Sequence, residues 1–194
     1  MQRIGIIGAQ SKHAEFFASL FNREKRFDDF RVTRICGLDE PERLGYVLSC
    51  APIRHVDAAP GETIAGCDAL LVTTRLANTH YDMAAACLRA GKPVFVDKPF
   101  TATVEEATAL AQMSHECGAA LCGGSTLCFD PQLDGAMLER VRCAPHIALR
   151  YRADPDSPFG GYAFYLSHLT DLCCRCFGGD FSGVEVRRQG GHVV

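Results

Sequence analysis

Residues 68–100 read DALLVTTRLANTHYDMAAACLRAGKPVFVDKPF, and this stretch decides the fold. The apolar run 70–72 predicts a buried strand, and a second apolar run at 94–96 predicts another. Between them, Tyr81, Ala84, Ala85 and Leu88 follow the i, i+3, i+4, i+7 spacing of a helix with one apolar face. A strand, a helix and a strand joined by short connections form a βαβ unit, so the two strands are expected to be parallel.

Polar side chains follow both strands of this unit. Thr73, Thr74 and Arg75 come after the first strand, and Asp97 and Lys98 come after the second. In open parallel sheets, ligands bind beyond the carboxyl ends of the strands. The sequence therefore predicts a binding site at this edge of the sheet.

The same alternation of strands and helices extends in both directions from this unit, up to about Gly123. Further strands are expected at residues 3–7, 31–38, 53–56 and 119–122, with helices between them and a helix at 104–117 that Thr103 and Glu106 cap. This pattern predicts a Rossmann-type doubly wound α/β sheet for residues 1–123.

Residues 124–194 follow a different pattern, expected to form a shortened α+β second domain for substrate binding and oligomerisation. Helices are predicted at 130–142 and 162–177, and strands at 146–152 and 183–188. Two strands make a marginal sheet with an unpaired edge, so we expect this part of the chain to join a homo-oligomer.

The composition excludes several classes of function. The net charge of −3, with no lysine or arginine run, argues against nucleic acid and anionic membrane surfaces as partners. No apolar run is long enough to span a membrane, and a strand begins at once without a signal segment, so a cytoplasmic location is expected. The 11 cysteines lie scattered through predicted strands and helices, which favours buried thiols over a disulfide framework or a metal site.

The turn after the first strand is a candidate nucleotide site with an incomplete fingerprint. A dinucleotide pyrophosphate binds where a glycine turn opens a helix, within the pattern G-x-G-x-x-G. Only Gly8 matches here: Gln10 and His13 occupy the later glycine positions, and Asp39 lies two residues beyond the position expected for the ribose-binding acid. Ser11 and Lys12 remain available to a phosphate at the start of the helix.

The chain resembles the Gfo/Idh/MocA family, named for glucose–fructose oxidoreductase and inositol dehydrogenase. The resemblance rests on RIGIIGA at 3–9, THYDMA at 79–84, AGKPVFVDKPF at 90–100, FDP at 129–131 and GGYAFYLSHLTDLCCRCFGG at 160–179. It implies a Rossmann domain that binds NAD or NADP. It also implies hydride exchange with a sugar, cyclitol or similar polyol in the cleft beside a second domain.

The resemblance also implies roles for individual residues. Lys98 falls on the family's lysine, and the Lys98–Pro99 bond is expected to be cis. His168 falls on the catalytic histidine, and Asp171 on the acid one turn later. A histidine, or a lysine whose pKa burial lowers, is suited to take the hydroxyl proton of a carbinol. The remaining cofactor-binding candidates at the strand ends are Gly8, Gln10, Ser11, Lys12, Asp39, Thr73, Thr74, Asn78, His80 and Asp97.

Two readings of function stay open on the sequence alone. Phe164 stands where the family has an aspartate beside the histidine, and Tyr162 or Tyr165 would have to supply a hydroxyl instead. The Phe164 position and the missing glycines therefore keep two hypotheses open. One is an NAD(P)-dependent oxidoreductase, and the alternative is a non-catalytic relative that acts as a binding or assembly module.

Overall fold

A six-stranded parallel sheet forms the larger part of the molecule, in the strand order β3-β2-β1-β4-β5-β6. The computed structural model describes residues 1–38, 40–183, 185, 188–189 and 192–193. The strands are β1 (Gln2–Ile7), β2 (Phe30–Cys36), β3 (His55–Asp57), β4 (Ala69–Val72), β5 (Val94–Val96) and β6 (Leu121–Gly123). The chain adds strands outward from β1 in one direction through β2 and β3, and then in the other through β4, β5 and β6, as in a doubly wound fold.

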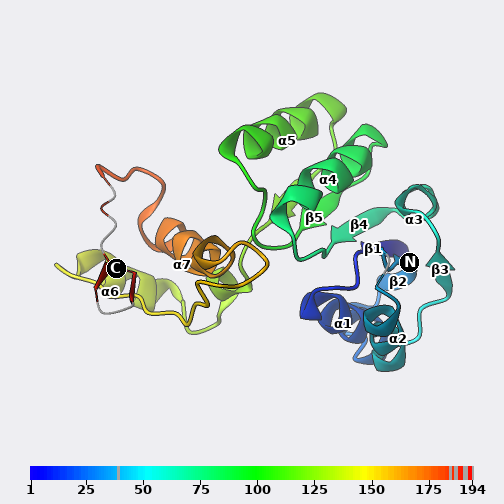
Figure 1. The fold of residues 1–194 in the computed structure, drawn as a ribbon, viewed down its shortest axis with the longest axis horizontal. Helices are drawn as coiled ribbons and strands as arrows, with labels where there is room; N and C mark the ends of the chain where they lie inside the picture. The colour runs from blue at the N-terminus through cyan, green and yellow to red at the C-terminus, as the bar shows by residue number, and fades with distance from the viewer. Residues whose placement is uncertain (39, 184, 186–187, 190–191, 194) are drawn as a thin grey trace.

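Helices cover both faces of this sheet, as Figure 1 shows. One face carries α1 (Lys12–Ala18), which continues into the π-helical turn η1 (Ser19–Arg23), and α2 (Pro41–Cys50). The other carries α3 (Pro60–Gly66), α4 (His80–Arg89) and α5 (Val104–Cys117). Thr103 and Glu106 form the expected capping box at the start of α5.

Two apolar cores result from the alternation of side chains along the strands. On β4, Leu70 and Val72 pack with α3, α4 and α5, whereas Leu71 packs with α1 and α2. Burial on both faces explains why the central strands read as continuous apolar runs. The prediction of a Rossmann-type sheet for this part of the chain is confirmed.

The chain beyond β6 forms a smaller part that lies beside the sheet (Figure 1). It contains the 3₁₀ turns η3 (Thr126–Phe129), the helices α6 (Gly135–Cys143) and α7 (Tyr162–Phe177), and an antiparallel pair, β7 (Arg188–Gln189) and β8 (His192–Val193). The turn η2 (Ala77–Thr79) precedes α4. No helix among the described residues is both long and apolar enough to cross a bilayer.

Three predictions for the smaller part need correction. Residues 146–152 form no strand, since no neighbouring strand in the described chain pairs with their backbone. The helix expected from 130 begins at Gly135, because the Asp134 side chain caps it by accepting from Met137 N–H, while Asp130 closes a turn to Gln132. Within the strand expected at 183–188, residues 183 and 185 are not in a strand and Arg188 starts β7, while residues 184, 186 and 187 lie outside the described chain.

Candidate functional site

Lys98 lies just beyond the carboxyl end of β5, where the βαβ unit predicted a site. Its side chain is 8% exposed, and the Lys98–Pro99 bond is cis, as the family resemblance implied. Burial lowers the pKa of the ammonium from 10.5 to about 8; the negative charge of Asp97 opposes this shift and the positive charge of Arg75 adds to it. An amine in this range changes protonation state close to neutral pH.

The Asp97 carboxylate is the hub of the sheet edge. It is 1% exposed, and its Oδ1 lies 2.7 Å from His13 Nδ1 and accepts from Lys98 N–H at 2.8 Å. Its Oδ2 accepts from the Ser11 hydroxyl at 3.0 Å. Asp97 therefore ties the start of α1 to the end of β5, the two places where the sequence predicted cofactor contacts.

Thr73, Thr74 and His80 brace the loops rather than face solvent. The Thr73 hydroxyl donates to Gly8 C=O at 2.6 Å, and the Thr74 hydroxyl lies 2.7 Å from that of Thr79. His80 is fully buried, with Nδ1 2.7 Å from Pro99 C=O and Nε2 2.9 Å from Thr74 C=O. These three cofactor candidates therefore hold the loops at the strand ends in place through the hydrogen bonds of their side chains.

The other candidates around the first turn differ in exposure. Lys12 and Asn78 are exposed, and no side chain, that of Asn78 included, makes a capping bond at the start of α4. The Ser11 hydroxyl donates a hydrogen bond to Asp97 and accepts one from His13 N–H. Asp39 lies outside the described residues.

The turn at Gly8 retains features that suit a dinucleotide. Within the described chain, the backbone N–H groups of Ala9, Gln10 and Lys12 form no hydrogen bond. Unpaired N–H groups at the start of a helix favour a phosphate. The Gln10 Oε1 atom is buried without a partner, a free acceptor for a hydroxyl or amide hydrogen. The residues present at this turn therefore fit the dinucleotide that the resemblance implies.

Helix α7 brings His168 to the same site. His168 is 7% exposed, and its pKa is lowered from 6.5 to about 4 by burial and by the positive charges of Lys98 and His13, against Asp97. Its Nδ1 lies 2.6 Å from the Ser125 hydroxyl, and the Tyr151 ring centre lies 4.8 Å from the imidazole. The expected hydroxyl partner thus comes from Ser125 rather than from Tyr162 or Tyr165.

Asp171 lies one turn after His168 and accepts from Ser125 N–H at 2.7 Å. It supports the loop that carries Ser125 and makes no described contact with His168. Ser125 and His13 are the polar site residues that were missing from the predicted set. Ser125 follows β6 at the carboxyl edge of the sheet, and this position is the signal that could have identified it. His13 stands at a glycine position of the fingerprint, where the sequence favours a packed or surface histidine over a ligand.

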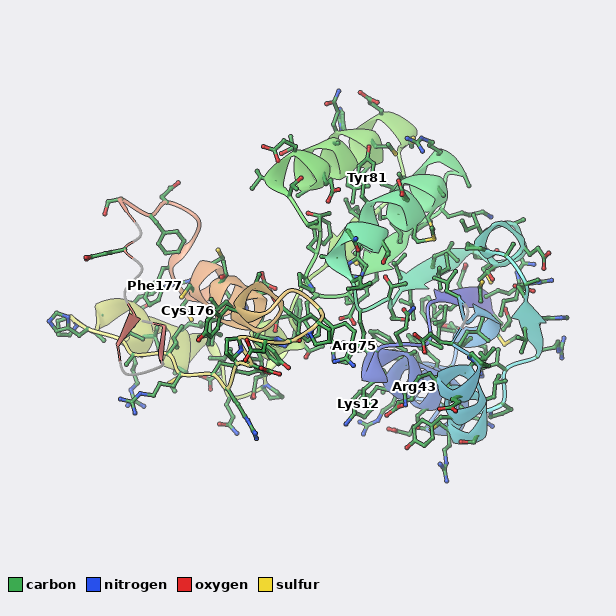
Figure 2. The ribbon with its side chains drawn as sticks, in the orientation of Figure 1. Lys12, Arg43, Arg75, Tyr81, Cys176 and Phe177 are labelled. Carbon is green, nitrogen blue, oxygen red and sulfur yellow. The ribbon has the colours of Figure 1, made fainter. Side chains whose placement is uncertain are left out.

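Aromatic rings cover the cationic groups of the site. Lys98 Nζ lies 3.4 Å from the centre of the Phe164 ring, and the Arg75 guanidinium carbon lies 3.7 Å from the centre of the Phe159 ring. Arg75 lies where the sheet and the smaller part of the chain meet (Figure 2). Burial lowers the pKa of Arg75.

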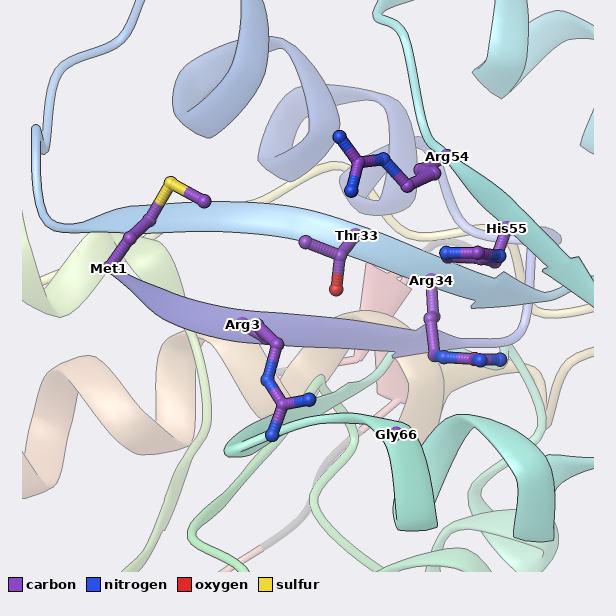
Figure 3. Close-up of a pocket in the computed structure, with 7 residues that line it drawn as sticks. All are labelled: Met1, Arg3, Thr33, Arg34, Arg54, His55 and Gly66. Carbon is purple, nitrogen blue, oxygen red and sulfur yellow. The ribbon is translucent and has the colours of Figure 1, made fainter.

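A hollow lies elsewhere, between β1, β2, β3 and α3 (Figure 3). It measures about 280 Å³ and includes Arg3, Arg34 and His55 in its lining. Arg3 and His55 stand near the starts of parallel strands, and Lys98 follows the end of one. The hollow is therefore at the opposite edge of the sheet from Lys98.

Comparisons with known proteins identify the family of the chain and its fold. A family model described as "Oxidoreductase family, NAD-binding Rossmann fold" (GFO_IDH_MocA) matches residues 2–124. A curated relative, scyllo-inositol 2-dehydrogenase (NADP(+)) IolW of Bacillus subtilis (strain 168), is 27% identical over 124 residues, which are 56% of this chain and 35% of the relative. The chain thus spans about a third of that relative's length.

Solved structures show the same fold. The apo scyllo-inositol dehydrogenase of Lactobacillus casei matches 92% of this chain and 55% of its own, with a TM-score of 0.72 and 15% identity. The same organism's enzyme with bound NAD(H) and scyllo-inositol matches 73% of this chain and 40% of its own, with a TM-score of 0.58 and 17% identity. With the family model covering more than half of the sequence, the chain belongs to the Gfo/Idh/MocA family of oxidoreductases and carries its NAD-binding Rossmann fold.

Proposed function

We propose that this chain is an NAD(P)-dependent oxidoreductase that exchanges a hydride with a carbinol carbon of a sugar, cyclitol or similar polyol. The observation that carries the proposal is the buried Lys98 amine, with its pKa near 8, at the carboxyl edge of the sheet beside His168. The inositol dehydrogenases among its relatives support a polyol as the substrate class.

The chain's own residues divide the work of binding. When bound, a nicotinamide dinucleotide supplies the hydride acceptor or donor. The free N–H groups of Ala9, Gln10 and Lys12 would hold its phosphates, and Gln10 Oε1 would accept from a hydroxyl or amide. Asp97 fixes the start of α1 against β5, which sets the position of this turn relative to Lys98.

Lys98 is suited to exchange the proton of the substrate hydroxyl. In the direction of oxidation its neutral amine accepts the hydroxyl proton, and in the direction of reduction its ammonium returns it. The lowered pKa makes both forms accessible at neutral to slightly basic pH.

Fluorescence titration with NADH and NADPH tests cofactor binding, and turnover with a panel of inositols and sugars tests the reaction. We expect binding of at least one cofactor, and loss of turnover in Lys98→Met. Lys92→Met is the matched control, because Lys92 lies before β5 at the other edge of the sheet. Absence of binding of either cofactor at high concentration would overturn the proposal.

The second candidate is a non-catalytic relative that acts as a binding or assembly module. The Phe164 ring over Lys98 favours it, since this ring occupies space next to the amine that a substrate would have to approach. A turnover that disappears in Lys98→Met or His168→Ala would refute this candidate. Binding of a nicotinamide cofactor without turnover on any polyol would support it.

We further propose that the chain divides after Gly123 into a cofactor-binding domain (1–123) and a smaller substrate and oligomerisation domain (124–194). The end of β6 at Gly123 supports the boundary. Beyond it, large apolar side chains are exposed among the described residues, and contact with a second copy would cover them. They include Phe129, Met137, Ile147, Phe177 and Phe181. A monomer by light scattering at micromolar concentration would contradict this assembly.

A reducing cytoplasm is the compartment we propose. None of the 11 cysteines of the chain is in a disulfide among the described residues, and Cys67, Cys87 and Cys176 are buried. Free buried thiols are typical of proteins kept reduced. Thiol counting on protein purified without reductant tests this, and a disulfide in protein taken directly from cells would contradict it.

A further inference from the structure

Ser125 and His168 form a buried hydroxyl–imidazole pair that the family resemblance did not imply. The Ser125 Oγ atom lies 2.6 Å from His168 Nδ1, and the two residues are 2% and 7% exposed. Oγ has one further partner among the described residues, Leu127 N–H, from which it accepts at 3.2 Å as the cap of η3.

These contacts determine which atom donates. A hydroxyl has one hydrogen to give. The other contact of Oγ uses it as an acceptor, so Nδ1 is the only described acceptor for the Ser125 hydrogen. If Nδ1 carried a proton instead, the buried hydroxyl hydrogen would have no partner, which costs about 1–3 kcal/mol. Ser125 therefore donates, and the neutral ring carries its proton on Nε2.

The loop that carries Ser125 is itself held by α7. Asp171 accepts from Ser125 N–H at 2.7 Å, and its Oδ2 lies against Gly124. Gly124 has φ +104°, and a Cβ there would come within 2.9 Å of that oxygen. One helix thus supplies both the imidazole and the carboxylate that fixes the imidazole's partner, so the Ser125–His168 geometry is preorganised.

A fixed Nε2–H changes what His168 can do. His168 Nε2 has no partner within the described chain, so its hydrogen is free for a ligand. A neutral ring protonated on Nε2 donates a hydrogen bond from that atom and cannot take up a proton there. The proton of a substrate hydroxyl would therefore have to go to Lys98.

We propose that Ser125 is a positioning residue that fixes His168 as the Nε2–H tautomer, so that His168 donates a hydrogen bond to the substrate oxygen and Lys98 alone exchanges the proton. The tautomer follows from the contacts of Ser125; the division of labour rests on the proposed function. In oxidation a bound nicotinamide would accept the C–H hydride and Lys98 Nζ would take the O–H proton. The carbinol would become a carbonyl that accepts from His168 Nε2–H.

Long-range ¹H–¹⁵N NMR of the imidazole rings tests the tautomer without substrate or turnover. The chain has 7 histidines, and the His168→Gln variant assigns the His168 signals. At pH 7 we expect the Nε2–H pattern, with Nδ1 unprotonated. We expect Ser125→Thr to keep this pattern and Ser125→Ala to give a mixture of tautomers. Ser167→Ala is the matched control, since its hydroxyl donates to Phe164 C=O within the same helix.

An Nδ1–H pattern in the unmodified protein would overturn the assignment, and so would an unchanged Nε2–H pattern in folded Ser125→Ala. If circular dichroism shows that Ser125→Ala does not fold, the NMR patterns of the unmodified protein and of Ser125→Thr still decide which tautomer His168 adopts. Both results are independent of whether the protein turns over any polyol.

Kinetics test the division of labour. The His168→Gln amide can still donate to the substrate oxygen, so we expect kcat to fall only about 10-fold. Lys98→Met should lower kcat by about 10²–10⁴-fold, as for loss of a general acid or base. Equal losses in the two variants would overturn this division even with the tautomer confirmed. Absence of turnover in the unmodified protein would instead overturn the proposed function and leave the tautomer standing.

Discussion

Lys98 Nζ lies 3.4 Å from the centre of the Phe164 ring. Phe164 occupies the position at which the family resemblance predicts an aspartate. The ring excludes water from the ammonium, which disfavours the charged form, and its π-face attracts the cation, which favours it. The lowered pKa of Lys98 has burial as its largest cause, so the exclusion of water dominates.

Substitutions at Phe164 are expected to move the pKa of Lys98 in opposite directions. Phe164→Asp adds a negative charge and admits water, so the pKa should rise above 8. Phe164→Leu keeps an apolar neighbour but removes the attraction of the ring, about 0.5–2 kcal/mol, so the pKa should fall below 8. The pH dependence of Lys98 acetylation, followed by peptide mass spectrometry, measures both changes.

Phe177→Leu serves as the control for these variants, because Phe177 lies at the far end of the same helix, α7, from Phe164. Its pKa for Lys98 should stay near 8. Shifts of the same sign in Phe164→Asp and Phe164→Leu would show that the ring does not act through burial and cation–π attraction as described.

The pKa of His168 predicts a loss of stability in acid. The folded protein holds the pKa of this imidazole near 4, against 6.5 for the free side chain. Between pH 6.5 and 4 the unfolded state takes up a proton that the folded state refuses, so the free energy of unfolding falls as pH falls through this window. The full loss is about 3 kcal/mol.

His168→Gln should remove this contribution. Urea unfolding at pH 7 and at pH 4 measures it: the unmodified protein should lose about 3 kcal/mol more between these pH values than the variant does. His115→Gln, on the last turn of α5, is the control that should leave the difference unchanged. Equal acid losses in the protein and in His168→Gln would contradict a buried neutral imidazole.

Much of the sheet could be predicted because its signals are local. Apolar runs, helical spacing and the capping box of Thr103 and Glu106 are each contained in a short segment, and they placed β5, α5 and α7 at their observed bounds. A strand at 146–152 failed because a strand depends on a neighbour, and β propensity alone does not reveal that none pairs with it.

The site was predictable where it follows strand ends and where the resemblance identified His168 on α7. Lys98 and Asp97 were predicted because ligands bind beyond the carboxyl ends of parallel strands, and because the family resemblance includes both residues. The partner of His168 was not, because Ser125 lies 43 positions away in the chain and comes to the imidazole only when α7 packs on the loop after β6. His80 was expected at the cofactor, but full burial between two carbonyl groups makes it a brace.

The Asp97 hub predicts a measurable cost for loss of its charge. In Asp97→Asn an amide NH₂ would face the Ser11 hydroxyl, His13 Nδ1 or Lys98 N–H, so at least one buried partner would lose its acceptor. We expect a loss of about 1–3 kcal/mol in the free energy of unfolding by urea. Asp82→Asn, exposed on α4, should change it by less than about 0.5 kcal/mol. A neutral effect of Asp97→Asn would show that the carboxylate is not required by its partners.

Gly8 combines a backbone conformation that side chains rarely adopt with a close contact to Thr74. Its φ is +96°, and a Cβ there would come within 2.6 Å of Thr74 Cγ2 and 2.8 Å of Thr74 N. Gly8→Ala should therefore destabilise the fold by about 1–3 kcal/mol and disturb the free N–H groups that follow it, so that NADH and NADPH bind more weakly.

Gly45→Ala is the matched control: a Cβ at this position in α2 meets nothing within 4 Å, and alanine should stabilise the helix by about 0.5–1 kcal/mol. Urea unfolding and nicotinamide fluorescence measure the two effects separately. If Gly8→Ala lowered stability but left cofactor affinity unchanged, the turn would be structural only, and the proposed phosphate contacts of Ala9, Gln10 and Lys12 would be wrong.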